Sequence, residues 1–294
     1  MEATSKRSIH LCYENGDWMS QLPENLWDVP LHYLSLPGSH DTMTYCLDKN
    51  SDISVNESKL LQVIDKCMPC IIHPIIMKWS ITQDILWEIL KWLQAHPQEV
   101  VILACRNFDG LTKELHHHLI SCIKMIFHSK LCPKDVVPTL RNMWTYGYQV
   151  IISYEDVNEV MKHRELWPAI PYWWGNKTAT QDLIQYLESM KKNGRPDCFF
   201  VAGINLTENL EYILEHPFGS LKKMALSSLP VLKLWIKQQY PGPKRECINI
   251  IAGDFIGNHD FVNDVIELNK KIIPPLHYYG NETELKDVSR LSAS

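Results

Sequence analysis

Near-continuous runs of apolar residues recur along the second two thirds of the chain. They are EVVILACRNF (99–108), QVIISYED (149–156), CFFVAGINLT (198–207) and INIIAGDFIG (248–257). A strand that is covered on both faces needs apolar residues at successive positions, as in the parallel sheets of α/β proteins. The pattern therefore predicts four buried parallel strands.

Amphipathic segments with helical spacing lie between and after these runs. They cover residues 111–127, 182–194 and 260–272. In the first of them, leucine or isoleucine recurs at every fourth position, which places one apolar stripe on a helix. The second ends in two lysines and a glycine, a common helix stop. Alternating strands and helices predict an α/β fold whose parallel sheet is either open or closed into a barrel.

A shorter apolar run, Leu34–Leu36, precedes the sequence PGSHD. Pro37 and Gly38 indicate a turn, and His40 and Asp41 follow it directly. A histidine beside a carboxylate at the end of a strand is suited to acid–base chemistry. A solvated turn that caps a helix explains the same residues equally well, because Ser39 and Asp41 are both good N-caps.

Each of the later apolar runs also ends in polar residues. These are Arg106 and Asn107, then Tyr154, Glu155 and Asp156, then Asn205 and Thr207, and finally Asp254. The carboxyl ends of parallel strands lie at one edge of the fold, where active sites are found. We therefore expect His40, Arg106 and Asp254 to converge there.

A simpler explanation is that strands end in polar residues because the chain must return to water. It accounts for each strand end taken alone. It accounts less well for Asp254, because an unpaired carboxylate inside the apolar run IIAGDFIG would be costly. His40 and Arg106 are its natural partners.

The composition limits the classes of partner and compartment. The chain has 294 residues, a formal net charge of −5 and 45% hydrophobic residues, so it can form a sizeable core and has no basic excess for nucleic acid. The first 25 residues have no signal-peptide core, and no run of 18 apolar residues exists. We expect a cytoplasmic protein whose nine cysteines are reduced thiols.

Two other motifs invite a functional interpretation. The run His116–His118 does not predict a metal site, because adjacent helical residues point about 100° apart. The motif PYWWGN (171–176) is suited either to the core or to a lipid interface, and tryptophan is more often core. The chain has no G-x-S-x-G, so a serine hydrolase that uses Ser39 is not supported.

Five motifs in order, LPGSHDTMTY, EVVILACRNF, YWWGN, VAGINLTENL and NIIAGDFIG, resemble those of the phosphatidylinositol-specific phospholipase C X domain-containing proteins. The resemblance covers residues 16–273 and leaves a polar tail, 274–294. It implies a distorted TIM-type (β/α) barrel and a phosphoric diester hydrolase that acts on a phosphoinositide or a related lipid at a membrane surface, with no role for nucleic acid.

The resemblance also implies roles for individual residues. His40 matches the histidine that takes a proton from the inositol 2-hydroxyl, and Asp254 matches the carboxylate that orients it. We assign Asp41 to the catalytic residues with them. It stands where calcium-dependent relatives have an asparagine ligand, so no calcium or other cofactor is expected. Arg106 corresponds to a basic residue at the headgroup, and we assign Tyr154 and Asn205 to substrate binding with it.

The chain departs from the family pattern after residue 83. It has no D-x-R, and none of its histidines between 41 and 98 lies in a strand-like context. The segment 75–82 resembles the part before two family strands and 84–103 the part after them, so we expect those two strands, with the second histidine, to be missing. The alternative function is then an inactive isoform that at most binds lipid headgroups or proteins.

Overall fold

Parallel strands form the centre of the structure, which is a computed structural model that describes residues 15–40, 79–108, 111–216, 219–257 and 260–272. The strands are β1 (Leu36–Ser39), β2 (Val101–Cys105), β3 (Val150–Tyr154), β4 (Leu166–Trp167), β5 (Tyr172–Trp173), β6 (Val201–Gly203) and β7 (Ile250–Gly253). The four predicted strands are confirmed as β2, β3, β6 and β7.

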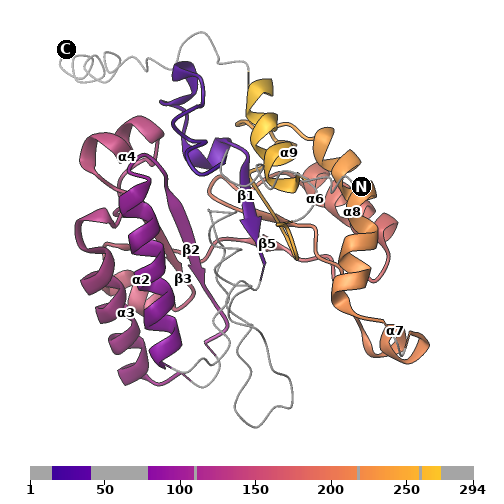
Figure 1. Cartoon of the computed structure of the whole chain (residues 1–294), viewed down its shortest axis with the longest axis horizontal. Helices are drawn as coiled ribbons and strands as arrows, with labels where there is room; N and C mark the ends of the chain where they lie inside the picture. Colours follow the sequence, from indigo (N-terminus) through magenta and orange to yellow (C-terminus); the bar gives the residue numbers. More distant parts are fainter. Residues whose placement is uncertain (1–14, 41–78, 109–110, 217–218, 258–259, 273–294) are drawn as a thin grey trace, which may run out of the picture.

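Helices flank the strands on two sides (Figure 1). They are α2 (Trp79–Ala95), α3 (Lys113–Phe127), α4 (Leu140–Tyr146), α5 (Val157–Lys162), α6 (Thr180–Asn193), α7 (Leu210–Glu215), α8 (Leu221–Lys237) and α9 (Phe261–Glu267). Short 3-10 turns cover Glu24–Leu26, Leu31–Tyr33, His128–Lys130 and Leu268–Lys271. The three predicted helical segments appear as α3, α6 and α9 with the turn that follows it.

The strands pair in the orders β1-β7-β6-β5 and β2-β3-β4, and all of these pairs are parallel. β4 and β5 are two ends of one stretch, 166–173, which is interrupted between Pro168 and Pro171. Its first end pairs with β3 and its second with β6, so it carries the chain from one sheet to the other. Proline has no backbone N–H to donate, which explains why this strand does not pair along its whole length.

With β4 and β5 counted as one, six strands follow in the order β2, β3, β4–β5, β6, β7 and β1. A complete TIM barrel has eight. Within the described residues, β1 pairs only with β7 and β2 pairs only with β3, so the sheet is open between β1 and β2. The predicted junction at Gln83–Asp84 lies inside the continuous helix α2. The opening therefore lies between the two strands that flank the junction in the sequence.

The strands are buried on both faces, so successive side chains enter different cores. Ile102, Ile151, Val201 and Ile250 belong to a core inside the curved sheet, which we call the lumen core. Their neighbours on β2 and β3 pack against α2 and α3. Their neighbours on β6 and β7 pack against α6, α8 and α9.

Two buried amide side chains fix the start of β1. Asn269 accepts a hydrogen bond from Ser35 N at 2.7 Å and donates one to Ser35 O at 2.9 Å. Asn249 donates to Leu34 O at 2.7 Å. These amides satisfy backbone groups that a neighbouring strand would otherwise satisfy. The position of β1, and of His40 at its end, is set in this way.

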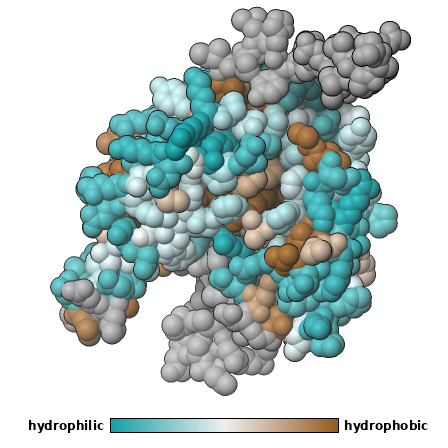
Figure 2. Space-filling model, turned by 180° about the vertical axis from the view of Figure 1, so that it is seen from behind, coloured by the Kyte–Doolittle hydropathy of each residue, from teal (hydrophilic) through white to brown (hydrophobic). Residues whose placement is uncertain are grey.

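One face of the exterior is predominantly polar. Figure 2 shows a surface that is largely hydrophilic, with hydrophobic residues in separate small groups. In the part of the chain that the structure describes, no helix combines the length and the apolar character needed to cross a bilayer.

A buried carboxyl group joins the amino-terminal segment to the sheet. Glu99 lies just before β2 with only 1% of its surface exposed, and its Oε1 accepts a hydrogen bond from Met19 N at 2.8 Å. Burial raises the pKa of Glu99 to about 8, and the nearby carboxylate of Asp17 adds to this shift. Glu99 is therefore mainly protonated at neutral pH in the folded protein.

We predict that Glu99 makes the protein less stable as the pH rises. The raised pKa means that the folded state holds a proton that the unfolded state releases, so stability falls between the unfolded value near 4.5 and the folded value of about 8. Glu99→Gln cannot titrate. In urea unfolding from pH 5 to pH 8, the unfolding free energy of the parent should fall relative to that of the variant. A difference that stays constant with pH would contradict this account.

Candidate active site

The ends of β1 and β7 bring a histidine and a carboxylate together. His40 follows β1 and Asp254 follows β7, and these strands are neighbours with Ser39 paired to Gly253. His40 N donates to Gly253 O at 3.0 Å. The side chains meet with His40 Nδ1 2.9 Å from Asp254 Oδ1, and they are only 6% and 10% exposed.

This contact determines how the imidazole can act. A carboxylate only accepts hydrogen bonds, so Nδ1 of His40 carries the proton and Nε2 carries the lone pair of the neutral ring. A histidine oriented in this way by a carboxylate is arranged as a general base.

The hydrogen-bonded chain continues from Asp254 to the next strands. Asn205, which follows β6, donates from Nδ2 to Asp254 Oδ2 at 3.4 Å. Tyr172 of β5 donates from its hydroxyl to Asn205 Oδ1 at 2.6 Å. We call His40, Asp254, Asn205 and Tyr172 the polar relay. Asn205 and Tyr172 hold the carboxylate of Asp254 in position. Asn205 has only 6% of its surface exposed.

Arg106 supplies a positive charge beside the relay. It follows β2, and its Cζ lies 5.6 Å from the centre of the Tyr172 ring. Its Nε is buried and has no hydrogen-bond partner among the residues that the structure describes. A guanidinium with an unused donor is suited to binding an anion.

The motif PYWWGN is divided between the core and the site. Trp173 is 4% exposed and packs on the helix side, which agrees with the core interpretation. Trp174 is 44% exposed, and its ring centre lies 5.2 Å from that of His40. Tyr172 belongs to the relay. The sequence analysis missed Tyr172 and Trp174 as site residues, because it did not identify this stretch as a strand.

The structure does not place Tyr154 with the other predicted site residues. Its side chain is fully buried on the helix side of β3, and its hydroxyl lies 2.7 Å from Nδ1 of His116. The structure therefore does not bring Tyr154 together with His40 and Asp254, because its hydroxyl links β3 to α3. The same contact places His116 in a packing role. Asp41 lies outside the described residues.

No group of three or more histidine, cysteine, aspartate or glutamate side chains is arranged to hold a metal ion in the described part of the chain. Asp41 is not among the residues to which this statement applies, because it lies outside the described part of the chain. The polar relay is built from one carboxylate, two neutral polar groups and an imidazole. Such a set provides hydrogen bonds for a base rather than the several oxygen ligands of a hard cation.

The comparison with known sequences gives close relatives. Human PI-PLC X domain-containing protein 1 is 52% identical over 308 aligned residues, which cover 90% of this chain and 95% of that protein. The mouse PI-PLC X domain-containing protein 1 is 49% identical, covering 89% and 88%. This chain belongs to the PI-PLC X domain-containing protein family. Mouse protein 2 of the family is 31% identical and covers 90% of each chain. No family model matches the chain.

Solved structures extend the likeness to bacterial proteins. A phosphatidylinositol-specific phospholipase C from Listeria monocytogenes superposes with a TM-score of 0.63 at 16% identity, covering 86% of this chain and 98% of the other. The Staphylococcus aureus phosphatidylinositol-specific phospholipase C gives 0.59 at 13% identity, covering 86% and 97%. At these identities the likeness concerns the fold, and the predicted distorted TIM-type barrel is confirmed.

The alignment with the human X domain protein has more positions than this chain has residues, 308 against 294. Since 90% of this chain is about 265 residues, more than forty aligned positions have no residue here. The alignment with the mouse protein 1 has 305 positions but covers only 89% of this chain, so a similar number of its positions have no residue here. These X domain relatives therefore have residues without a counterpart in this chain.

The Tyr172 ring lies directly against the backbone of Gly203 in this X domain. A Cβ on Gly203 would lie 2.4 Å from Cε1 of Tyr172 and 2.8 Å from its hydroxyl oxygen. We predict that Gly203→Ala displaces the ring, breaks its bond to Asn205 and lowers the unfolding free energy by about 1–3 kcal/mol.

A double-mutant cycle measured by urea unfolding separates this cause from a general effect of alanine. In a Tyr172→Ala background the obstructing ring is absent, so Gly203→Ala should have a much smaller cost. An equal cost in both backgrounds would contradict the contact as the cause.

Proposed function

We propose that this site is the phosphodiesterase site of a phosphoinositide-type phospholipase C, with its base side complete and its acid side missing. The observation that carries the proposal is the pair of His40 and Asp254 at adjacent strand ends, with Nδ1 and Oδ1 at 2.9 Å. The names of the relatives and of the structural neighbours support phosphatidylinositol lipids as the substrate class.

In the reaction, Nε2 of His40 takes the proton from the 2-hydroxyl of inositol as that oxygen attacks the phosphorus. Asp254 keeps the ring in the correct tautomer and stabilises the imidazolium that forms. Asn205 and Tyr172 hold Asp254 in place. Trp174 lies beside the imidazole, with ring centres 5.2 Å apart, and would limit the access of water.

The oxygens of the phosphorane gain negative charge in the transition state. Arg106 lies beside Tyr172, and its Nε forms no hydrogen bond with a described residue. It is suited to bind the phosphate and to offset this charge. The lipid reaches the site from a membrane surface, and we place that surface on the cytoplasmic side.

The departing diacylglycerol oxygen needs a proton from an acid on the opposite side. Within the described residues, no second histidine stands near the relay. The family places that histidine on the strands that this chain lacks after residue 83. A missing general acid lowers the rate by roughly 10²- to 10⁴-fold, so turnover by this chain should be close to background.

The polar relay and Arg106 also favour a second function, which is binding without cleavage. The relay and Arg106 place a cation beside a polar group of side chains, and the relay itself includes no second histidine. Such an arrangement can bind an inositol phosphate headgroup without cleaving it. On this view, the chain acts as a headgroup-binding isoform of an active family member.

The first prediction of this proposal compares the chain with a restored form. The restored form carries the additional segment of the human relative after Gln83. It should hydrolyse phosphatidylinositol and a soluble inositol phosphodiester at least about 100-fold faster than the present chain at equal folded concentration, because the acid is present.

His40→Ala in the restored form is the matched control and should abolish the gain. Asn193→Ala, on an exposed residue at the end of α6, should leave it unchanged. Equal turnover by the present and restored chains would mean that another residue supplies the acid. Headgroup binding, measured by calorimetry on both forms, then tests the second function separately.

Activity of the restored form should not require calcium. Asp41 replaces the amide ligand of calcium-dependent relatives, and charge compensation is assigned to Arg106. Hydrolysis measured in excess chelator should match that in buffer alone. A loss of activity that added calcium reverses would show that a metal ion does the work assigned to Arg106.

A further inference from the structure

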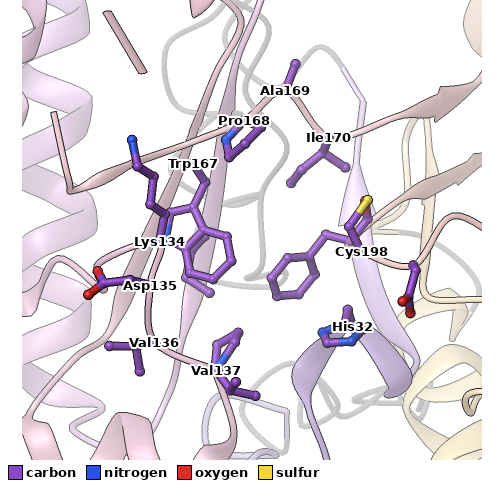
Figure 3. Close-up of a pocket in the computed structure, with 14 residues that line it drawn as sticks. His32, Lys134, Asp135, Val136, Val137, Trp167, Pro168, Ala169, Ile170 and Cys198 are labelled. Carbon is purple, nitrogen blue, oxygen red and sulfur yellow. The ribbon is translucent and has the colours of Figure 1, made fainter. Parts of the chain in front are cut away.

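A cavity lies at the amino ends of the strands, at the opposite end of the sheet from His40. His32 and Phe199, which precede β1 and β6, form part of its wall. His40 and Asp254 follow β1 and β7, so parallel strands separate the two sites. The cavity has a volume of about 260 Å³. Trp167, Ile170 and Val137 also line it, and it is partly open to solvent (Figure 3).

The interrupted strand explains why the cavity exists. Between β4 and β5 the chain has no strand partner, so the space between β3 and β6 is not filled by a continuous row of side chains. The stretch is nevertheless held in place, because Ser153 Oγ accepts a hydrogen bond from Ile170 N at 3.0 Å and donates one to Pro168 O at 3.1 Å. The cavity is thus a fixed feature of the fold.

The charged groups at the cavity are already engaged elsewhere. Lys134 donates from Nζ to the carbonyl oxygens of Val160 and His163, and Asp135 accepts from Arg164 at 2.7 and 2.8 Å. Figure 3 shows the charged ends of Lys134 and Asp135 directed away from the space between Trp167 and His32. The third charged residue of the lining, Asp197, accepts a hydrogen bond from the Tyr33 hydroxyl at 3.3 Å and interacts electrostatically with the guanidinium of Arg195.

His32 is the polar group that remains available. Its ring centre lies 5.9 Å from that of Phe199 in an edge-to-face arrangement, and no described residue forms a hydrogen bond with its ring nitrogens. Burial lowers the pKa of His32, and the guanidinium of Arg195 lowers it further, so the ring is neutral at pH 7. A neutral imidazole offers one donor and one acceptor, and tautomer exchange allows either nitrogen to take either role.

We propose that this cavity is a second binding site, for a small uncharged aromatic molecule with one hydrogen-bonding group. The rings of Trp167, Phe199 and His32 provide edges and faces for an aromatic ring. A charged molecule would lose its hydration beside charged groups that already have partners. His32 orients the ligand through its single polar group. Pockets of this kind, largely apolar with few polar groups, are typical of small-molecule sites.

Indole is a suitable probe because it is flat and uncharged and carries one N–H donor. Saturation-transfer NMR titrations of the full chain compare it with 1-methylindole, which lacks the donor, and with tryptamine and indole-3-acetate, which carry opposite charges. Indole should bind most tightly. Loss of one hydrogen bond should weaken 1-methylindole roughly threefold to tenfold.

Three variants locate the binding. Val137→Trp fills the cavity from a wall residue that is 56% exposed, and it should abolish indole binding. Val157→Trp is the matched control, since Val157 is 68% exposed on α5 and does not line the cavity. His32→Phe keeps an aromatic wall and should remove the difference between indole and 1-methylindole.

Each alternative result would overturn the proposal. Indole binding that survives Val137→Trp would place the probe elsewhere. Equal affinity for all four probes would remove the role of His32 and the preference for neutral molecules. No measurable indole binding by folded parent chain would mean that the cavity takes no ligand of this class. Circular dichroism of each variant confirms that the comparison is between folded proteins.

Discussion

Strands that are buried on both faces impose a strict alternation on their side chains, and the remaining features of this protein depend on it. Val101 and Leu103 of β2 face the helices, whereas Ile102 and Ala104 enter the lumen core. A polar residue at a strand end follows the same alternation as the apolar residues before it. Arg106 is on the same face of β2 as Ile102 and Ala104, because every second residue of a strand points to the same side. Its side chain therefore reaches the site.

The same alternation explains which strands and site residues could be predicted from the sequence. The apolar runs identify β2, β3, β6 and β7, and the polar residues at their ends identify Asp254, Asn205 and Arg106 as neighbours. Tyr154 has the alternation of Val150 and Ile152, which face α2 and α3. Its outward direction was thus readable from the sequence, once the face of each residue was assigned. Grouping strand-end residues by their position alone placed Tyr154 with residues that face the other side of the sheet.

Other features could not be read from the pattern of a single chain. β4 and β5 have two residues each and are separated by prolines, so the stretch 166–173 carries too short an apolar signal to predict a strand. Tyr172 therefore could not be placed. The contact between Gly203 and Tyr172 joins residues on different strands, and only their pairing brings them together. The bond between Asn269 and Ser35 spans more than two hundred residues and leaves no local pattern.

The order of strands explains how the proposed general base and its supports can be present without the proposed acid. The polar relay passes from β1 to β7, β6 and β5, and each of its hydrogen bonds joins groups on adjacent strands of one sheet. No bond of the relay crosses the opening between β1 and β2. Removing strands from that opening therefore leaves the general base and its supports in place.

Arg106 alone comes from the other sheet. It meets the relay across the lumen at the ring of Tyr172, and this contact does not depend on strands at the opening. In the proposed mechanism, the groups that bind and activate the substrate are thus held by strand pairings that the structure describes, whereas the leaving-group acid is assigned to strands expected at the opening. The proposal therefore makes substrate binding and turnover separable, because it assigns them to different parts of the same sheet.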